Sequence, residues 1–183
     1  MKNEIVPLFC RVASDAVTIT NVLSKPEALK IGFQALRVAG MRGIHVTIFW
    51  GIVESEPRVY DWSAYEELFE IAETAGELEV SVEFAFHAKD CGGEEGDACT
   101  ASLPAWVHET AWGPLAGKGG EQRGNPEVFY MDQSGLRENA VISLFAEQDE
   151  NLLPTGDGKT FRSAIQCYEE FMTSFVDTFE KYF

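Results

Sequence analysis

The chain has 183 residues, enough for one domain but few for a complete barrel, and its 45% hydrophobic content excludes wholesale disorder. Acidic residues outnumber basic ones by 30 to 14, and the net charge of −16 disfavours binding to nucleic acid or anionic membranes. Four scattered cysteines without a CxxC pair argue against a disulfide scaffold and a structural zinc site.

The first half of the chain alternates strand and helix patterns. The predicted strands cover residues 5–11, 43–50 and 78–87. One predicted helix lies between Pro26 and Gly40, and a second follows Asp61 and Ser63, where Ser63-x-x-Glu66 forms a capping box. Pro26 opens the first helix and Gly40 closes it, and Gly76 ends the second. This β-α-β-α-β order predicts parallel strands joined by right-handed crossovers, and therefore an α/β fold.

The second half is less regular until its last segment. A long irregular region, from residue 88 to about residue 160, follows the third strand. It contains a short predicted helix near 104–110, an extended pair at 128–132 and 139–145, and a linker-like stretch at 116–124. The last helix presents one apolar stripe of Phe161, Ile165, Tyr168, Phe171, Met172, Phe175, Val176 and Phe179. Long loops at the carboxyl ends of strands are usually functional.

The stretch FHAKDCGGEEGDACTASLPAWV, residues 86–107, stands where such a loop begins. As a calcium loop it lacks the alternating oxygen ligands and the closing Glu of an EF-hand. As a phosphate cradle it lacks the Lys and Ser/Thr of a P-loop, and its own acids would repel phosphate. A polar turn is the third interpretation, and composition alone favours it.

The same stretch resembles the beta-amylase signature. The matching residues are His87, Cys91, Gly92, Gly93, Gly96, Asp97, Pro104, Trp106 and Val107. Other blocks resemble the family in the same order, among them NVLSKPEALK at 21–30, ALRVAGMRGIHV at 35–46, YDWSAYEELF at 60–69 and SAIQCYEEFMTSF at 163–175. The resemblance covers nearly the whole chain.

The resemblance implies a (β/α)8 TIM-type barrel that hydrolyses α-1,4-glucans such as starch from the non-reducing end and releases maltose with inversion. We expect residues 1–183 to form one partial barrel domain, the first three β/α units with a long loop after strand three. The family's catalytic acid and base, both Glu, fall beyond Phe183, so no catalytic residue is assigned and this chain is expected to be inactive alone. No cofactor or metal is implied.

The retained family positions belong to substrate binding. His87 and Asp97 are expected to hydrogen-bond glucose, and Gly92, Gly93 and Gly96 to form a lid loop. The family's aspartate at the end of strand two is Thr47 here, which keeps a hydroxyl but loses the charge. The Asn of the signature is Glu94, two extra residues separate His87 from Cys91, and the Gly-Val-Asp expected after the Ile-Ser-Leu strand is replaced at 145–147. These departures indicate a divergent member.

Alternative functions are a non-catalytic glucan-binding or regulatory relative, and an unrelated doubly wound α/β module that binds a small ligand. The expected partner is an α-1,4-glucan or maltose, with no nucleic acid and no membrane, and association through an open barrel edge is expected. The sequence shows no signal peptide and no membrane span, which by default indicates a cytoplasmic or plastid-like location.

Two further expectations concern side chains on the strands. Phe49 and Trp50 are predicted either to stack against sugar or to pack in the core. Strand parity places His45 on the face of Thr47, and Glu83 on the face of His87, so His45 and Glu83 are expected to approach one another or a water. The alternative is that both are solvated.

Overall fold

The computed structural model describes residues 6–87, 89–90, 100–101, 103–112, 125–143 and 153–182. The described chain divides into two compact units. The first unit comprises the described residues within 1–48 and 63–84, and the second those within 49–62, 85–90 and 100–183. The predicted lid loop, Gly92, Gly93 and Gly96, lies outside the described residues.

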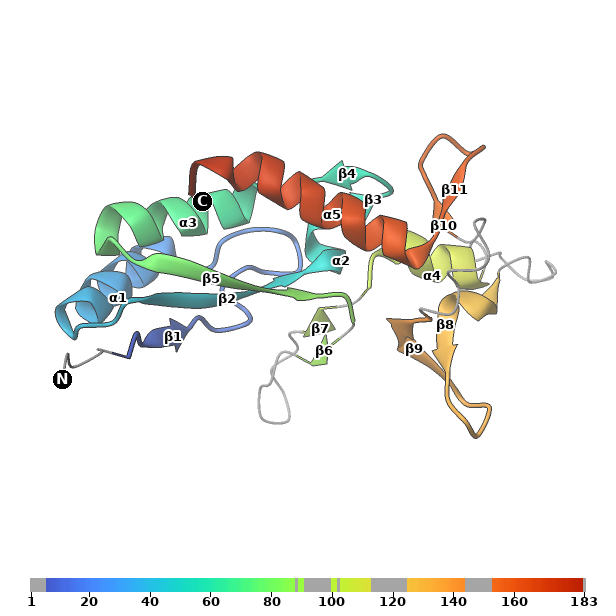
Figure 1. Ribbon diagram of the computed structural model, residues 1–183, viewed down its shortest axis with the longest axis horizontal. Coiled ribbons are helices and arrows are strands. Elements are labelled where there is room, and N and C mark those ends of the chain that lie inside the picture. The colour runs from blue at the N-terminus through green and yellow to red at the C-terminus, as the bar shows by residue number, and fades with distance from the viewer. Residues whose placement is uncertain are drawn as a thin grey trace. The chain divides into compact units, whose positions relative to one another are not determined.

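The first unit is built on a three-stranded sheet with the order β1-β2-β5 (Figure 1). Strand β1 (Phe9–Arg11) pairs in parallel with β2 (Gly43–Phe49), with Cys10 opposite Ile44 and Arg11 opposite His45. Strand β5 (Glu79–Ala85) lies on the other side of β2, and its arrow points the same way. The predicted parallel arrangement is therefore confirmed, with the three strands side by side in chain order, although β1 is shorter than predicted.

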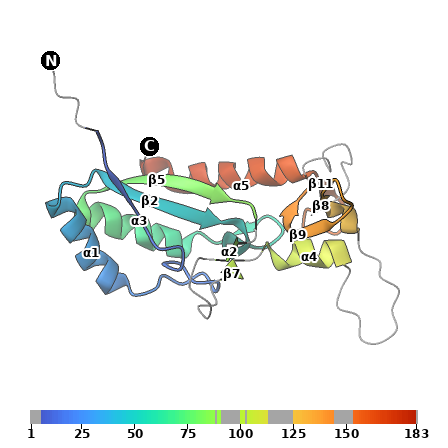
Figure 2. The ribbon, with the colours of Figure 1, turned by 90° about the horizontal axis from the view of Figure 1, so that it is seen from below.

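Helices α1 (Pro26–Val38) and α3 (Ser63–Gly76) pack on each other and lie on the same side of this sheet (Figure 2). Buried residues on α3 include Tyr65, Leu68, Phe69 and Ala72, which have the i, i+3, i+4, i+7 spacing of one helical face. Gly40 has the expected positive φ of 86°, but after α3 it is Glu77 rather than Gly76 that takes the left-handed conformation. Gly76 instead lets the end of α3 approach α1 closely, because an added Cβ would lie 3.2 Å from the carbonyl oxygen of Phe33 on α1.

The second unit begins with short elements that the sequence did not predict. Helix α2 (Trp50–Val53) follows β2 directly, and β3 (Glu54–Glu56) pairs with β4 (Val59–Tyr60) in a tight antiparallel turn. Arg58, at the turn, has a φ of 64°. Each strand is only two or three residues long, too short for a periodic pattern to show.

The long helix α5 (Ala164–Phe179) begins with a capping box, in which Ser163 accepts from the backbone N–H of Gln166 and the Gln166 side chain accepts from that of Ser163. The predicted stripe divides into two halves. Phe171, Phe175 and Phe179 are buried and surround the Trp62 ring. By contrast, Ile165, Met172 and Val176 are 40–50% exposed. Trp62 Nε1 also donates to Ser174 Oγ at 2.9 Å, which fixes the ring on α5.

Small elements occupy the region that was predicted to be irregular. They are β6 (Lys89–Asp90), β7 (Thr100–Ala101), α4 (Ala105–Trp112), the 3-10 turn η1 (Pro126–Val128), β8 (Phe129–Met131), β9 (Arg137–Ile142), β10 (Leu153–Pro154) and β11 (Phe161–Arg162). A final 3-10 turn, η3 (Glu180–Tyr182), follows α5. The β8–β9 hairpin confirms the predicted extended pair, and Gly135 at its turn has a φ of 84°. The fold is mixed α/β, and the strands of the described residues form no closed barrel.

Candidate functional site

The structure places the predicted substrate residues in different units. Thr47 lies near the carboxyl end of β2 in the first unit, and His87 follows β5 in the second. Asp97 and the lid glycines lie outside the described residues. A shared site of His87, Asp97 and Thr47 therefore stays a prediction.

His87 is held by its backbone next to an aromatic cluster. It forms an antiparallel bridge with Val141 of β9, and its side chain is exposed. The preceding ring, Phe86, lies 4.0 Å from Tyr168 and 6.0 Å from Trp50 between ring centroids. The backbone at His87 is thus fixed by a hairpin on one side and by packed rings on the other, while the imidazole remains accessible.

Trp50 and Phe49 are core residues, because each is only 1% exposed. Trp50 packs edge-on against Trp106, with ring centroids 5.5 Å apart, and against Tyr168 at 5.8 Å. Its Nε1 donates to the Glu54 carboxylate. The packing interpretation is correct for both side chains, and neither has a free ring face on which a sugar could stack.

A cluster of polar side chains occupies one face of the three-stranded sheet. We define the polar cluster as Arg11 of β1, His45 and Thr47 of β2, and Ser81 and Glu83 of β5. His45 Nε2 lies 3.4 Å from Glu83 Oε2, and His45 Nδ1 lies 3.2 Å from Ser81 Oγ. The predicted approach of His45 and Glu83 is confirmed.

Thr47 and Arg11 complete the polar cluster around the same carboxylate. Thr47 Oγ1 donates to Glu83 Oε2 at 3.4 Å and accepts from Arg11 Nη2 at 3.2 Å. Arg11 Nη2 also lies 4.0 Å from Glu83 Oε2. The pKa of Glu83 lies below its usual value, first because His45 donates a hydrogen bond to the ionised form and also because Arg11 is nearby.

Replacing His45 with phenylalanine is expected to raise the pKa of Glu83 back toward its usual value, because the principal donor to the carboxylate is lost. A carboxylate with a lowered pKa stabilises the fold above its unfolded-state pKa, and that contribution is lost as the pH falls through the folded-state pKa. Carbon-detected NMR titration of the Glu83 carboxyl measures the change. Glu79, whose pKa is lowered by Arg42, serves as the internal control. An unchanged Glu83 pKa would show that the His45 contact is unimportant.

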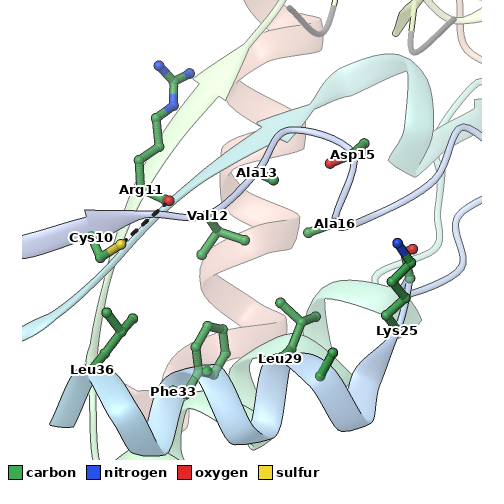
Figure 3. Close-up of a pocket in the computed structure, with 13 residues that line it drawn as sticks. Cys10, Arg11, Val12, Ala13, Asp15, Ala16, Lys25, Leu29, Phe33 and Leu36 are labelled. Atoms are coloured by element: carbon green, nitrogen blue, oxygen red, sulfur yellow. Dashed lines mark hydrogen bonds between the residues drawn. The ribbon is translucent and has the colours of Figure 1, made fainter. Parts of the chain in front are cut away.

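A groove with a volume of about 450 Å³ lies on the opposite side of β1, toward α1 (Figure 3). Val12, Leu29, Phe33 and Leu36 form most of its apolar wall, with Asp15 and Lys25 at one end. The Arg11 side chain points away from α1 in this view, consistent with its place in the polar cluster on the other face. The described residues include no group of three or more His, Cys, Asp or Glu that could hold a metal ion.

Sequence reasoning missed a buried ion network in the second unit. Glu54 and Arg162 form an ion pair with side chains only 0% and 1% exposed. Glu54 also accepts from Trp50 Nε1 and, at 2.8 Å, from the backbone N–H of Arg58. Because Glu54 and Arg162 are separated by 108 residues, no local sequence pattern predicts that they pair.

The Arg162 guanidinium also makes contacts beyond Glu54. It pairs with Glu170, lies 3.4 Å from Tyr60 Oη, and stacks over Trp106 at 5.3 Å. Burial raises the pKa of Tyr60 to about 12, with the Glu54 charge adding to the effect. This network joins the β3–β4 turn to α5. Its buried, mutually paired side chains are those of a structural element rather than a binding site, although Arg162 Nε has no hydrogen-bond partner among the described residues.

The sequence profile of glycosyl hydrolase family 14 matches residues 9–183. The chain belongs to this family. Beta-amylase 1, chloroplastic, from Arabidopsis thaliana is 39% identical over 176 residues, covering 96% of this chain and 27% of the relative. The family 14 chain also matches the solved catalytic domain of beta-amylase from Paenibacillus polymyxa, with a TM-score of 0.62 and 22% identity. That match covers 97% of this chain and 35% of the domain.

Another relative of this family 14 chain is named inactive beta-amylase 4, chloroplastic, also from Arabidopsis thaliana. It is 35% identical over 188 residues, covering 99% of this chain and 31% of the relative. The family 14 chain thus spans about a third or less of the length of these relatives. Among its described residues, no helix is long and apolar enough to cross a membrane.

Proposed function

We propose that this family 14 chain acts on, or binds, an α-1,4-glucan such as starch. The observation that carries the proposal is the match of the family profile to residues 9–183. We propose that the chain forms one partial barrel domain containing the first three β/α units of a (β/α)8 barrel. The similarity to a solved beta-amylase catalytic domain and the β1-β2-β5 order support this assignment. A plastid location is supported by the chloroplastic names of two relatives.

The proposed substrate residues are His87, Asp97 and Thr47, with Gly92, Gly93 and Gly96 as a lid loop. Sugar hydroxyls both donate and accept hydrogen bonds, so an imidazole, a carboxylate and a hydroxyl suit them. The exposed His87 and the partly exposed Thr47 support this role. Association of copies through the open edge of β1 is part of the same proposal, because an unpaired strand edge favours pairing with another chain.

We propose that the 183-residue polypeptide alone does not hydrolyse starch. Inverting hydrolysis needs two carboxyl groups roughly 6.5–9.5 Å apart across one glycosidic bond. On the polar face of the described sheet, strand parity leaves Glu79 and Glu83 as the two carboxylates, four residues apart on β5. Four residues of strand span about 13 Å. Glu79 is moreover paired with Arg42, so this pair does not match the required geometry.

Incubation of the purified polypeptide with soluble starch, with release of maltose as the readout, tests this proposal. No maltose above the no-enzyme control is expected. Maltose production that Glu94→Gln abolishes would overturn the proposal, because Glu94 would then be a catalytic group of a site that this assignment lacks. Glu95→Gln is the matched control on the neighbouring residue.

The second candidate function is a non-catalytic glucan-binding or regulatory protein. Thr47 in place of an expected aspartate favours it, and so does the relative named inactive beta-amylase 4. The two candidates differ in one measurement. A longer polypeptide carrying the family's acid and base would release maltose under the first function, whereas under the second it would bind glucan without turnover.

A further inference from the structure

The polar cluster differs from an ordinary surface ion pair because side chains from two strands, β1 and β2, converge on one carboxylate of the third, β5. His45, Thr47 and Arg11 all approach a single oxygen, Oε2 of Glu83. The other oxygen, Oε1, has no partner among the residues that the structure describes. Arg11 likewise uses Nη2 for its contacts with Thr47 and Glu83. The side chains of the cluster are therefore held in place, and Glu83 Oε1 and the other guanidinium nitrogens of Arg11 can still form hydrogen bonds with a ligand.

The polar cluster is also accessible. The side chains of Arg11 and Glu83 are each 54% exposed, and that of His45 is 32% exposed. The opposite face of β2 is buried, with Ile44, Val46 and Ile48 at most 3% exposed. Helix α1 faces Cys10 and Val12 across the groove (Figure 3), so it leaves the cluster uncovered. A ligand could reach Glu83 and Arg11 without displacing either helix of the first unit.

The charges of the cluster select against ionic ligands. Arg11 would repel a metal cation, and the described residues hold no three-residue metal-ligating group. Glu83 and a net charge of −16 would repel an anion. A neutral polyhydroxyl molecule is repelled neither by Arg11 nor by Glu83. Neighbouring hydroxyls can donate to Oε1 of Glu83 while another oxygen accepts from the Arg11 guanidinium.

We propose that the polar cluster is a binding subsite for a neutral oligosaccharide, with Glu83 as hydroxyl acceptor and Arg11 as donor. His45 is a positioning residue that holds the Glu83 carboxylate toward the sheet. The choice of an α-1,4-glucan as the ligand rests on the proposed function, whereas the polyhydroxyl class follows from the cluster itself. Neither Glu83 nor Arg11 is among the residues assigned by resemblance to the family.

Titration of the purified 183-residue polypeptide with maltoheptaose, followed by amide chemical shifts, tests the subsite. Glu83→Gln is expected to weaken binding by about tenfold or more, because a hydrogen bond to a charged group is worth about 1.5–3 kcal/mol. Arg11→Met is expected to weaken it similarly. The matched control is Glu79→Gln, which removes the same charge from the same strand and face at similar exposure, 53% against 54%. It should leave the affinity within about twofold of wild type, as expected for a surface site without ligand contact.

The outcomes separate this proposal from the function on which its glucan rests. If wild type binds maltoheptaose and both Glu83→Gln and Arg11→Met bind equally well, the subsite is wrong and the glucan function stands. If wild type binds cellohexaose or xylohexaose in a Glu83-dependent manner but not maltoheptaose, the subsite stands and the glucan function is wrong. If none of the three oligosaccharides binds, both are wrong. Unchanged amide shifts at α1 and α3 verify that each variant is folded.

Discussion

Replacing Arg162 with methionine is expected to lower the free energy of unfolding by about 3–5 kcal/mol, because the Glu54 carboxylate would remain buried without its cation. Methionine fills a similar volume, so the loss reports the charge rather than a cavity. Urea denaturation followed by tryptophan fluorescence measures it, since Trp50 and Trp106 both lie in this network.

Arg58→Met is the matched control. Arg58 pairs with Glu170, but its side chain is 46% exposed and its contact with Glu54 uses the backbone N–H. The expected loss is about 1 kcal/mol or less, as for other exposed pairs. Adding Glu54→Gln to Arg162→Met should recover part of the stability, because no buried charge then remains. An Arg162→Met protein as stable as Arg58→Met would contradict the assignment of a buried, energetically coupled pair.

Replacing Gly43 with alanine is expected to lower the free energy of unfolding by roughly 1–3 kcal/mol, the usual range for overpacking. An added Cβ would lie 2.5 Å from Cε1 of Phe9 and even closer to the backbone oxygen of Glu79. The Glu79 carbonyl cannot retreat easily, since it is backbone at the start of β5, whereas the Phe9 ring is 40% exposed and can rotate away. Strands β2 and β5 would have to separate at their amino ends.

Gly32→Ala provides the opposite expectation in the same unit. Gly32 lies within α1, and an added Cβ there would meet nothing within 4 Å. Alanine is favoured over glycine in a helix interior by about 0.5–1 kcal/mol, so this variant should gain stability. Both proteins can be compared in one set of denaturation curves. A stabilising Gly43→Ala would show that the strands do not approach as closely as the structure indicates.

Local patterns predicted those parts of the fold that local chemistry determines. The buried face of α3 follows from helical periodicity, and the contact of His45 with Glu83 follows from strand parity on neighbouring strands. The stripe on α5 is only half buried, because periodicity identifies an apolar face but not how much of it another element covers. The elements α2, β3 and β4 were too short to produce a pattern.

The candidate site, too, could be predicted only where local sequence patterns determine it. The sequence located Thr47 and His87 near strand ends through motif resemblance, yet it could not show that Thr47 engages Arg11 and Glu83. Nor could it pair Glu54 with Arg162, since an acid and a base separated by so much chain carry no mutual signal. Such contacts depend on which helices and strands pack against each other, and a single sequence gives little information about that packing.

The ion pair between Glu54 and Arg162 also joins two positions that lie far apart in the chain. The pair closes a loop of 108 residues, and the entropy of closing a flexible loop grows only with the logarithm of its length. Inserting ten residues into a flexible part of this loop would cost about 0.1 kcal/mol, far less than breaking the pair would. Because the loop includes packed elements such as α3 and β5, relatives should tolerate insertions between its elements but not within them.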